Sequence, residues 1–215
     1  MVALPLGEQV VGLVSLDEDT APPVLATADG VIKRVDPANF PGSKNDFDVI
    51  ALKDGDRLIG VASAADEDHI VLITSDGQLL HFPAGAVRPQ GRTAGGMAGI
   101  KLAAGASVVA LAVVPSGQAA DAVVVTVTGQ TNALPGTVAG SAKVTPFASY
   151  PAKGRATMGV RAHRFLRGED VLQLAWAGID PRAVGGAGQS VDLPAVDERR
   201  DGSGRPLAAP VVSIG

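Results

Sequence analysis

The strongest constraint on the fold of this chain is a phrase that recurs four times along it. The phrase reads apolar-x-x-Gly-x-x-apolar-apolar and appears as LPLGEQVV, LKDGDRLI, LAAGASVV and FLRGEDVL, starting at Leu4, Leu52, Leu102 and Phe165. A second phrase recurs in step with it, around Gly30, Gly77, Gly129 and, in a weaker form, Gly188. Units of this size cannot cover their own apolar face, so we expect similar modules to stack about a common centre.

The local pattern within each repeat predicts β-strands. The apolar runs are short, rich in Val, Ile, Leu and Thr, and bounded by Gly, Asp, Ser or Pro. Residues 23–35 (PVLATADGVIKRV) predict a hairpin with Gly30 at positive φ, residues 70–82 repeat it with Gly77, and residues 122–134 repeat it with Thr128-Gly129. No window has the periodicity of a long amphipathic helix, so helix should be scarce. We predict an all-β, propeller-like fold of about four four-stranded blades, either closed or an open crescent.

The repeats indicate one domain over residues 1–215, although length alone would also allow two. The units fall at roughly 22–64, 68–114, 120–177 and 182–215. Residues 1–16 supply a closing phrase without an opening one, so we expect them to complete a blade. The same observation suggests that the chain is a fragment of a longer protein.

Composition and charge exclude several classes of protein. The chain has no Cys, which removes disulfides and thiolate metal sites and fits a reducing compartment. No basic leader followed by an apolar stretch opens the chain, and no run of 18 apolar residues occurs, so we expect no membrane association and a cytoplasmic location. The net charge of −4 argues against a strongly electrostatic nucleic-acid binder. However, the acidic residues gather in turn-like runs while several basic ones recur beside glycines, so a segregated surface is expected.

Other constellations carry little chemistry. His69, His81 and His163 are dispersed without ligand spacing, so we predict no metal and no cofactor. The run Asp54-Gly55-Asp56 lacks the further ligands of a calcium loop and reads as a tight turn. Residues 95–99 (GGMAG) precede a strand rather than a helix, so they do not predict a phosphate-binding loop. Trp176 and the five Phe residues are expected in the core or between blades.

Four segments carry a resemblance to a known family. DGVIKR, SDGQLLHF, GRTAGGMAGIKL and KGRATMGVRAHRF are similar to the repeats in the C-terminal domain of the A subunit of bacterial type IIA topoisomerases, DNA gyrase and topoisomerase IV. The resemblance covers about residues 4–215 and is thin in the fourth repeat. It implies a propeller with strands exchanged between blades, a β-pinwheel, whose outer rim binds and bends duplex DNA.

The resemblance also implies that this domain catalyses nothing alone. The parent enzyme would be an ATP-dependent topoisomerase whose cleaving tyrosine lies in an upstream domain, and Tyr150, the chain's single Tyr, matches no catalytic context. Implied partners are duplex DNA, the B subunit and the upstream catalytic domains of the same polypeptide, in the bacterial cytoplasm at the nucleoid. The gyrase wrapping motif Q-R-R-G-G-K-G has no match here. Truncation of the first blade would also account for this, but the acidic balance and the weak fourth repeat favour the topoisomerase IV type.

Candidate DNA contacts follow from the chemistry of phosphate binding. A rim that holds duplex DNA without reading sequence needs Lys and Arg spaced along successive phosphates, and glycines that let backbone amides approach. Arg follows Gly in three repeats, at Gly91-Arg92, Gly154-Arg155 and Gly204-Arg205, and the remaining repeat offers Lys44 in its PGSKN loop. The flanking candidates are Lys33, Arg34, Arg88, Lys101, Lys143, Lys153, Arg161 and Arg164.

Without the resemblance, loop cations of this kind mostly solvate a surface. Basic residues at the position of Lys33-Arg34 are not shared by every repeat, so DNA contact is expected mainly over the first three. The alternative function is a propeller used as a protein-interaction platform, since a fold alone does not decide function. An enzymatic propeller is a third and poorly supported reading. A positive stripe along the rim would favour DNA over a protein partner.

Overall fold

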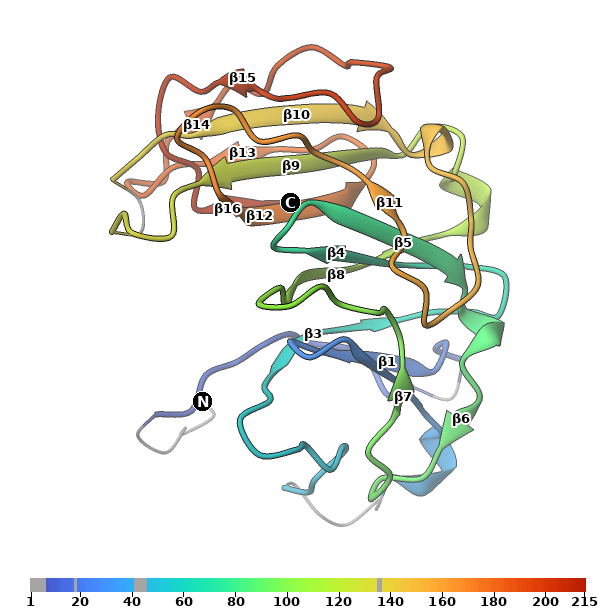
Figure 1. Ribbon diagram of the computed structural model, residues 1–215. Helices are drawn as coiled ribbons and strands as arrows, with labels where there is room; N and C mark the ends of the chain where they lie inside the picture. The colour runs from blue at the N-terminus through green and yellow to red at the C-terminus, as the bar shows by residue number, and fades with distance from the viewer. Residues whose placement is uncertain (1–6, 18, 41–45, 135–136) are drawn as a thin grey trace.

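The computed structural model describes residues 7–17, 19–40, 46–134 and 137–215. Its described part is all-β, with four successive sheets stacked along one arc (Figure 1). In spatial order, the first sheet contains β3 (Leu58–Ser63), β1 (Pro23–Thr27), β2 (Val31–Val35) and β6 (Pro89–Gln90), with β7 (Met97–Ala98) also on β2. The second contains β8 (Val108–Val114), β4 (His69–Thr74), β5 (Gln78–Pro83) and β11 (Val160–Arg161).

The third and fourth sheets follow the same order. The third contains β12 (Val171–Gly178), β9 (Val123–Gly129), β10 (Ser141–Pro146) and β15 (Arg205–Pro206). The fourth is smaller and contains β16 (Ser213–Ile214), β13 (Ala183–Val184) and β14 (Ser190–Val191). Helix in the described part is limited to single 3-10 turns, η1 (Pro37–Asn39), η2 (Ala84–Ala86), η3 (Ser116–Gln118) and η4 (Phe147–Ser149). The prediction of an all-β fold with little helix is confirmed.

Each hairpin turns on a glycine with positive φ. Gly30, Gly77 and Gly188 have φ of 81°, 80° and 81°, a conformation that costs a side chain free energy but costs glycine little. In the third repeat, Gly129 ends β9 instead of making the turn, which corrects the prediction of a tight hairpin at Thr128-Gly129. The return strand β10 begins at residue 141, directly after Gly140 with φ 65°. An insertion therefore separates two strands that the sequence placed side by side.

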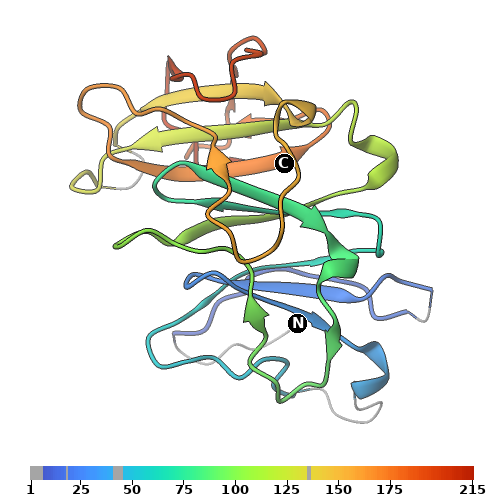
Figure 2. The same ribbon diagram turned by 45° about the vertical axis from the view of Figure 1, so that its right-hand side comes forward.

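Strands are exchanged between neighbouring sheets. After β5 the chain pairs with the first sheet as β7, with Ile32 opposite Met97, before it returns to the second sheet as β8. In the same way β11 and β15 pair with β5 and β10 of the preceding sheets. Figure 2 shows this path for β11, which crosses from the third repeat to the edge of β5. The exchange ties each sheet to the next covalently as well as by packing.

Apolar side chains fill the spaces between sheets. One buried cluster joins Ile32 of the first sheet to Leu80 of the second, and another joins Ile73 of the second sheet to Leu172 of the third. A smaller cluster lies between the third and fourth sheets. Burial of this kind contributes about 25 cal/mol per Å² of apolar area and provides the main stabilisation of stacked repeats.

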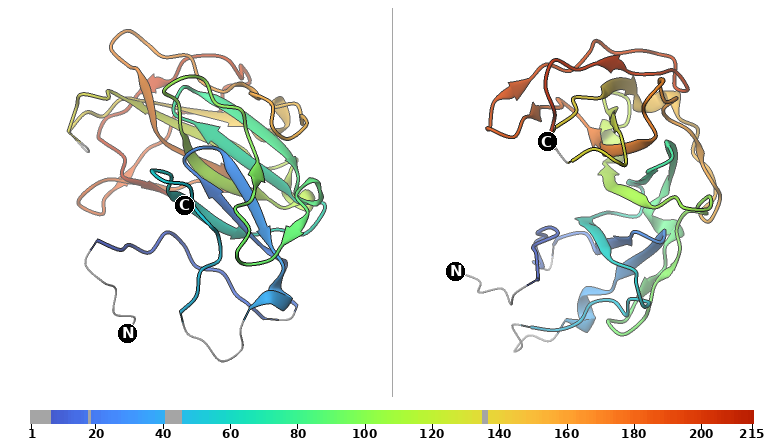
Figure 3. Two further views of the ribbon diagram at one scale, coloured as in Figure 1. Left: turned by 60° about the horizontal axis from the view of Figure 1, so that its bottom comes forward. Right: turned by 60° about the vertical axis from the view of Figure 1, so that its left-hand side comes forward.

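The sheets form an open arc (Figure 3, right). Among the described residues, no strand pairing joins the first sheet to the fourth. The described part of the N-terminal segment lies against the first sheet, where a Cβ added to Gly12 would meet Val61 of β3. Residues 12–16 and the first sheet line an apolar cavity of about 260 Å³ together with Phe40 and Phe47. The expectation that residues 1–16 complete a blade also concerns residues 1–6, which lie outside the described part.

Candidate nucleic-acid interface

The exchanged segments lie on the outer edge of the arc. In each of the first three sheets, the exchanged strand is at one end of the strand order, and β3, β8 or β12 is at the other. Because β3, β8 and β12 pack on one another in turn, their edge is the inner one. Segments 86–102 and 150–167 accordingly follow the convex side of the arc (Figure 3, right). They form the part of the rim on which the candidate residues are concentrated.

Charge is strongly segregated along this edge. Segments 86–102 and 150–167 contain eight of the 18 basic residues of the chain and none of its 22 acidic residues. The third exchanged segment, residues 195–206, is different because it contains three basic and three acidic residues. We call the first two segments together the basic band. A chain with a net negative charge therefore contains two exchanged segments with a net positive charge.

Most cations of the basic band reach solvent. Arg92 and Arg155 are half-buried, and the remaining six are exposed: Arg88, Lys101, Lys153, Arg161, Arg164 and Arg167. The sequence pattern of Gly-Arg pairs does not single out Arg167. The absence of acidic residues from 150–167 is the sequence signal that would have identified it, because Arg167 lies in this segment with Arg161 and Arg164.

Three glycines set the register of the exchanged segments. A Cβ added to Gly96, Gly159 or Gly204 would lie 2.9, 2.3 and 2.8 Å from the backbone oxygen of Ile32, Leu79 and Ala142, respectively. The three contacted residues each lie two positions after a hairpin glycine, namely Gly30, Gly77 and Gly140, so the three contacts are equivalent. We call Gly96, Gly159 and Gly204 the crossing glycines. Only glycine allows this close approach without moving the backbone of the neighbouring strand.

This register changes one sequence assignment. Counting back four residues from the crossing glycines gives Arg92, Arg155 and Arg200 as the equivalent loop arginines. Arg205 is therefore not the counterpart of Arg92 and Arg155, as its Gly-Arg dipeptide suggested. It is exposed and lies on β15, at the position of Met97 and Val160. The constant spacing to the crossing glycine was the signal that would have identified Arg200.

Neighbouring exchanged segments are hydrogen-bonded to each other. The amide of Ala156 donates to the oxygen of Gly99 at 2.7 Å, and the amide of Lys101 donates to the oxygen of Thr157 at 3.0 Å. The guanidinium of Arg155 also donates to the oxygen of Ala98. These contacts make the basic band continuous across the first two sheets.

Lys101 and Arg164 occupy the same place in successive repeats. Both follow their crossing glycine by five residues, and the amide of Arg164 donates to the oxygen of Gly202 at 3.0 Å, as that of Lys101 does to Thr157. Both side chains are exposed. The first two exchanged segments thus each present a cation at the same position, an arrangement that suits successive phosphates of one strand. In the third segment, the residue five positions after Gly204 is Ala209.

Three candidate cations are buried in this structure. The ammonium of Lys33, which is 0% exposed, donates to the oxygens of Val49, Arg92 and Ala94 at 2.8, 2.7 and 2.7 Å. Burial lowers the pKa of Lys33. An ammonium has three N–H donors, so all of them are used within the protein. This differs from the expectation of a surface contact, because Lys33 has no donor left for a phosphate.

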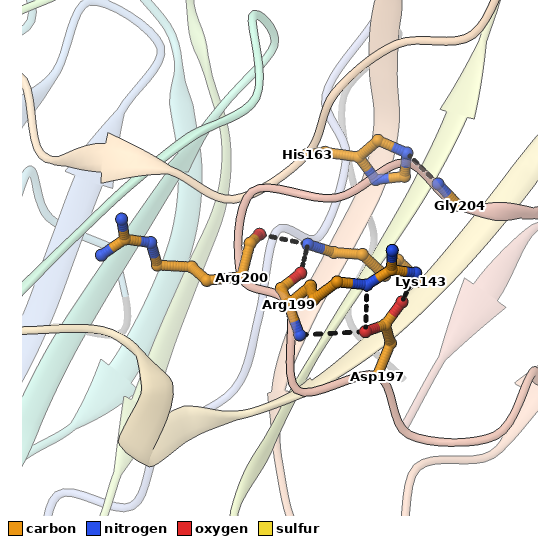
Figure 4. A network of polar contacts seen from close by, with 6 residues as sticks. All are labelled: Lys143, His163, Asp197, Arg199, Arg200 and Gly204. Carbon is orange, nitrogen blue, oxygen red and sulfur yellow. Dashed lines mark hydrogen bonds and ion pairs between the residues drawn. The ribbon is translucent and has the colours of Figure 1, made fainter.

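Arg34 and Lys143 are buried in a similar way. The guanidinium of Arg34 forms an ion pair with Asp66 at 2.5 Å and donates to the oxygen of Ala64 at 3.2 Å. The ammonium of Lys143 donates to the backbone oxygens of Arg199 and Arg200 (Figure 4). Burial lowers the pKa of Lys143 to about 8, against the opposing effect of nearby carboxylates. Neither side chain is available to DNA in this structure, and Lys44 lies outside the described residues.

The third exchanged segment balances its own charges. The guanidinium of Arg199 pairs with Asp197 at 3.0 Å, and the side chain of Arg199 is largely exposed. Hydrogen bonds from Arg199 hold the pKa of Asp197 at about 2, so this carboxylate stays charged at neutral pH. A phosphate approaching here meets carboxylates as well as cations. This makes the third segment a poorer phosphate site than the basic band.

The histidines and Tyr150 take structural positions. The ring of His163 contacts Thr126 Oγ1 through Nδ1 at 2.8 Å and accepts from the amide of Gly204 at 3.1 Å. Burial lowers the pKa of His163 to about 4 and so keeps the ring neutral. The phenol of Tyr150 is buried between sheets, and burial raises its pKa to about 12. Within the described ranges, no group of three or more His, Cys, Asp or Glu residues could hold a metal ion.

None of the helices in the described part of the chain is long and apolar enough to span a membrane.

Comparisons with known proteins agree on one family. Residues 24–65, 68–115 and 136–174 match the family model described as the DNA gyrase C-terminal domain, beta-propeller. The DNA gyrase A subunit of Deinococcus deserti is 38% identical over 141 residues, which is 64% of this chain and 16% of the relative. That of Salmonella typhimurium is 37% identical over 137 residues, 63% of this chain and 14% of the relative. The chain therefore spans less than a fifth of the length of either relative.

Solved structures support the same fold. A crystal structure of the C-terminal domain of DNA topoisomerase IV has a TM-score of 0.76 at 19% identity and covers 92% of this chain and 62% of that chain. Because the family model matches more than half of the sequence, and the fold matches a solved example, this chain belongs to the C-terminal β-propeller (β-pinwheel) domains of the A subunits of bacterial type IIA topoisomerases, DNA gyrase and topoisomerase IV.

Proposed function

We propose that this domain binds duplex DNA along the basic band and bends it, and that it does so by phosphate contacts without reading base sequence. The observation that carries the proposal is the basic band itself, whose two segments contain eight basic residues and no acidic ones and are joined by backbone hydrogen bonds. Phosphate contacts dominate non-specific DNA affinity, and an extended cationic edge suits them. The convex course of the band would curve a bound duplex around the domain.

In the parent enzyme, the domain would hold a flanking DNA segment and deliver it to the catalytic gate. The partners in this proposal are the upstream catalytic domains of the same polypeptide, which would carry the cleaving tyrosine, and the B subunit of the ATP-dependent parent enzyme. The site of action would be the bacterial cytoplasm at the nucleoid. The burial of Tyr150 supports this division, since a buried phenol with a raised pKa is poorly placed to attack DNA.

The test is a titration of short duplexes of unrelated sequence, followed by fluorescence anisotropy over a salt series. We expect equal affinity for all sequences and an affinity that falls steeply with salt. Lys101→Ala and Arg164→Ala should each reduce the slope of log affinity against log salt by about one unit. Lys53→Ala and Arg57→Ala are matched controls, because both residues are exposed in the acid-rich turn around Asp54 and Asp56. A chain that shows no salt-sensitive binding would contradict the proposal.

If the domain is instead a protein-interaction platform, the same duplex titrations should give a different result. A protein partner held by the rim would leave duplex affinity weak and unaffected by Lys101→Ala and Arg164→Ala. The basic band supports DNA over a protein partner, because its two segments contain basic residues and no acidic ones.

Within the family, we propose modest bending of the topoisomerase IV type rather than a full positive wrap. The support is the net charge of −4, the mixed charge of the third exchanged segment and the absence of a match to Q-R-R-G-G-K-G in the sequence. Ligating nicked circular DNA in the presence of the domain, then resolving the topoisomers, measures the wrap directly. We expect a small change in linking number. A large positive change would place the domain with the gyrase type instead.

A further inference from the structure

Two buried lysines hold the loops that carry the rim arginines. Lys33 lies on β2, three residues after Gly30, and Lys143 lies on β10, three residues after Gly140. The two positions are therefore equivalent in the first and third sheets. In the second sheet, the equivalent residue, three after Gly77, is Leu80.

The ammonium groups bind the same part of the loop in both sheets. Lys33 Nζ donates to the oxygens of Arg92 and Ala94 in the first exchanged segment. Lys143 Nζ donates to the oxygens of Arg199 and Arg200 in the third (Figure 4). Arg92 and Arg200 are the loop arginines defined above by their spacing to the crossing glycines. Each lysine thus extends from its strand to the exchanged segment and binds the backbone oxygen of the loop arginine itself.

We propose that Lys33 and Lys143 are positioning residues, which fix the loop backbone so that the loop arginines face DNA, and which do not touch DNA themselves. This inference rests on the proposed DNA-binding function. For Lys33 the geometry is complete, because its three donors are satisfied by three carbonyls and its side chain is fully buried. Hydrogen bonds from a charged donor are stronger than those between neutral groups, so three of them make a firm anchor.

The side chain of Arg92 is held at its other end. Its guanidinium carbon lies 5.4 Å from the ring centroid of Phe47, within the range of a cation–π contact. The backbone of Arg92 is fixed by Lys33 and its head group by an aromatic ring, so the arginine is preorganised. Preorganisation reduces the entropy lost when a side chain is ordered on binding.

The second sheet forms without a lysine anchor. With Leu80 at the equivalent position, its loop is fixed by other means: the amide of Lys153 donates to the oxygen of His81 at 3.1 Å, and Arg155 reaches the oxygen of Ala98. An apolar residue is therefore compatible with a folded blade at this position. This makes Lys33→Leu a substitution that the fold already tolerates once.

The test is a double-mutant cycle between Lys33 and Arg92 in the full chain, with affinity for a short duplex measured at about 0.1 M salt. We expect Lys33→Leu and Arg92→Ala each to weaken binding by about tenfold, the value of one phosphate contact at this salt concentration. Because Lys33 acts through Arg92, the double variant should bind no more weakly than Arg92→Ala alone. Hydrogen exchange of residues 91–96 should also accelerate in Lys33→Leu.

Lys101→Leu is the matched control, since Lys101 is an exposed lysine of the same band. Combined with Arg92→Ala, it should give the product of the two single effects, as independent contacts do. If Lys33→Leu combined with Arg92→Ala also gives the product of the two single effects, the inference is overturned. That result would indicate a direct contact of Lys33 with DNA or a general loss of structure. Unchanged affinity in Lys33→Leu or in Arg92→Ala would also overturn it.

A failure of the inference is distinguishable from a failure of the proposed function. If the salt slope and the effects of Lys101→Ala and Arg164→Ala persist while the cycle shows no coupling, DNA binding stands and only the role of Lys33 is lost. Should Lys33→Leu not fold, Lys33→Met keeps the length of the stem without its charge and repeats the cycle. Lys143→Leu provides an independent trial, with faster hydrogen exchange expected at residues 197–202 and unchanged exchange in that segment as the contrary result.

Discussion

The second and third exchanged segments share a backbone register and differ in charge. Both cross the neighbouring strand at a glycine, Gly159 and Gly204, and both place that glycine against a backbone oxygen two residues after the hairpin glycine. Yet residues 150–167 contain five basic residues and no acidic one, whereas residues 195–206 contain three of each. The comparison teaches that strand exchange depends on the close contact between a glycine and the backbone of the neighbouring strand. The charge of the exchanged segment can differ from sheet to sheet without changing this contact.

The largest effect is expected on stability, when a crossing glycine that sets the shared register is replaced. Gly159 has φ 78°, and an added Cβ would lie 2.3 Å from the oxygen of Leu79. We expect Gly159→Ala to lower the free energy of unfolding by about 3 kcal/mol, through both backbone strain and the clash. Gly204→Ala should cost less, since its closest backbone oxygen would be 2.8 Å away. Urea denaturation measures both.

The control for this prediction is Gly154, which lies in the same loop as Gly159. A Cβ at Gly154 would meet no atom within 4 Å, so Gly154→Ala should leave the unfolding free energy nearly unchanged. Equal stabilities for Gly159→Ala and Gly154→Ala would show that the crossing glycine does not fix the register.

The next effect tests the difference in charge. Reversing Lys101 and Arg164 together, as K101E/R164E, should weaken duplex affinity about a hundredfold at about 0.1 M salt, since each lost phosphate contact is worth about tenfold there. Reversing Arg205 in the mixed segment should have a much smaller effect. Anisotropy titration compares the two variants. A loss with R205E as large as that with K101E/R164E would remove the distinction between the segments.

A pH dependence is expected at the contact that joins the two segments. His163 lies in the second segment, and its ring accepts from the amide of Gly204 in the third. Its pKa is lowered to about 4 in the folded chain, so the unfolded chain binds a proton more readily. Stability from this group is therefore complete above the ordinary pKa and is lost as the pH falls from about 6.5 toward 4.

We expect this loss to be about 2 kcal/mol between pH 7 and pH 4.5, because one pKa unit corresponds to about 1.4 kcal/mol and most of the shift is titrated in this interval. The measurement is urea denaturation at pH 7 and at pH 4.5, and the comparison is with His163→Gln, which cannot take up the proton. The variant should be less stable at neutral pH but should lose less on acidification. The same acid sensitivity in both chains would assign it to other groups, of which His81 is one, since burial also lowers its pKa.

The smallest effect is expected when acidic charge is removed from the third exchanged segment, so that its charge resembles that of the second. Glu198 and Asp201 are exposed and are the acidic residues of residues 195–206 that do not pair with Arg199 in the structure. Glu198→Gln and Asp201→Asn together should raise duplex affinity by up to about tenfold, because two repulsive charges leave the rim. A variant with unchanged affinity would show that DNA does not reach the third segment.

Much of the fold was predictable because its signals are local. The hairpin glycines Gly30, Gly77 and Gly188 and the short apolar runs between them predict strands and turns from a few neighbouring residues. The third hairpin was not predictable in this way. Gly129 resembles a turn glycine in its own neighbourhood, but the pairing partner of its strand lies beyond an insertion. Strand pairing across a loop depends on contacts that no short window contains.

The candidate site was predictable in part. The loop positions of Arg92, Arg155, Lys101 and Arg164 follow from the repeat, and the structure places them on one edge. Lys33, Arg34 and Lys143 were grouped with them because a sequence records the charge of a side chain and not its direction. Side chains alternate between the two faces of a strand and can be long enough to reach a neighbouring loop, so a lysine on a strand can serve the interior.

The sequence by itself determined the repeat, the all-β class and the excess of basic residues over acidic ones in the exchanged segments. These properties depend on residue type and spacing along the chain. The tertiary structure decided which cations face solvent and which bind backbone carbonyls, and which arginine of the third segment is equivalent to Arg92. The reason is physical: burial and hydrogen bonding depend on the segments that strand exchange brings together, and these are 56 to 61 residues apart in the contacts of Lys33 and Lys143 with the loops.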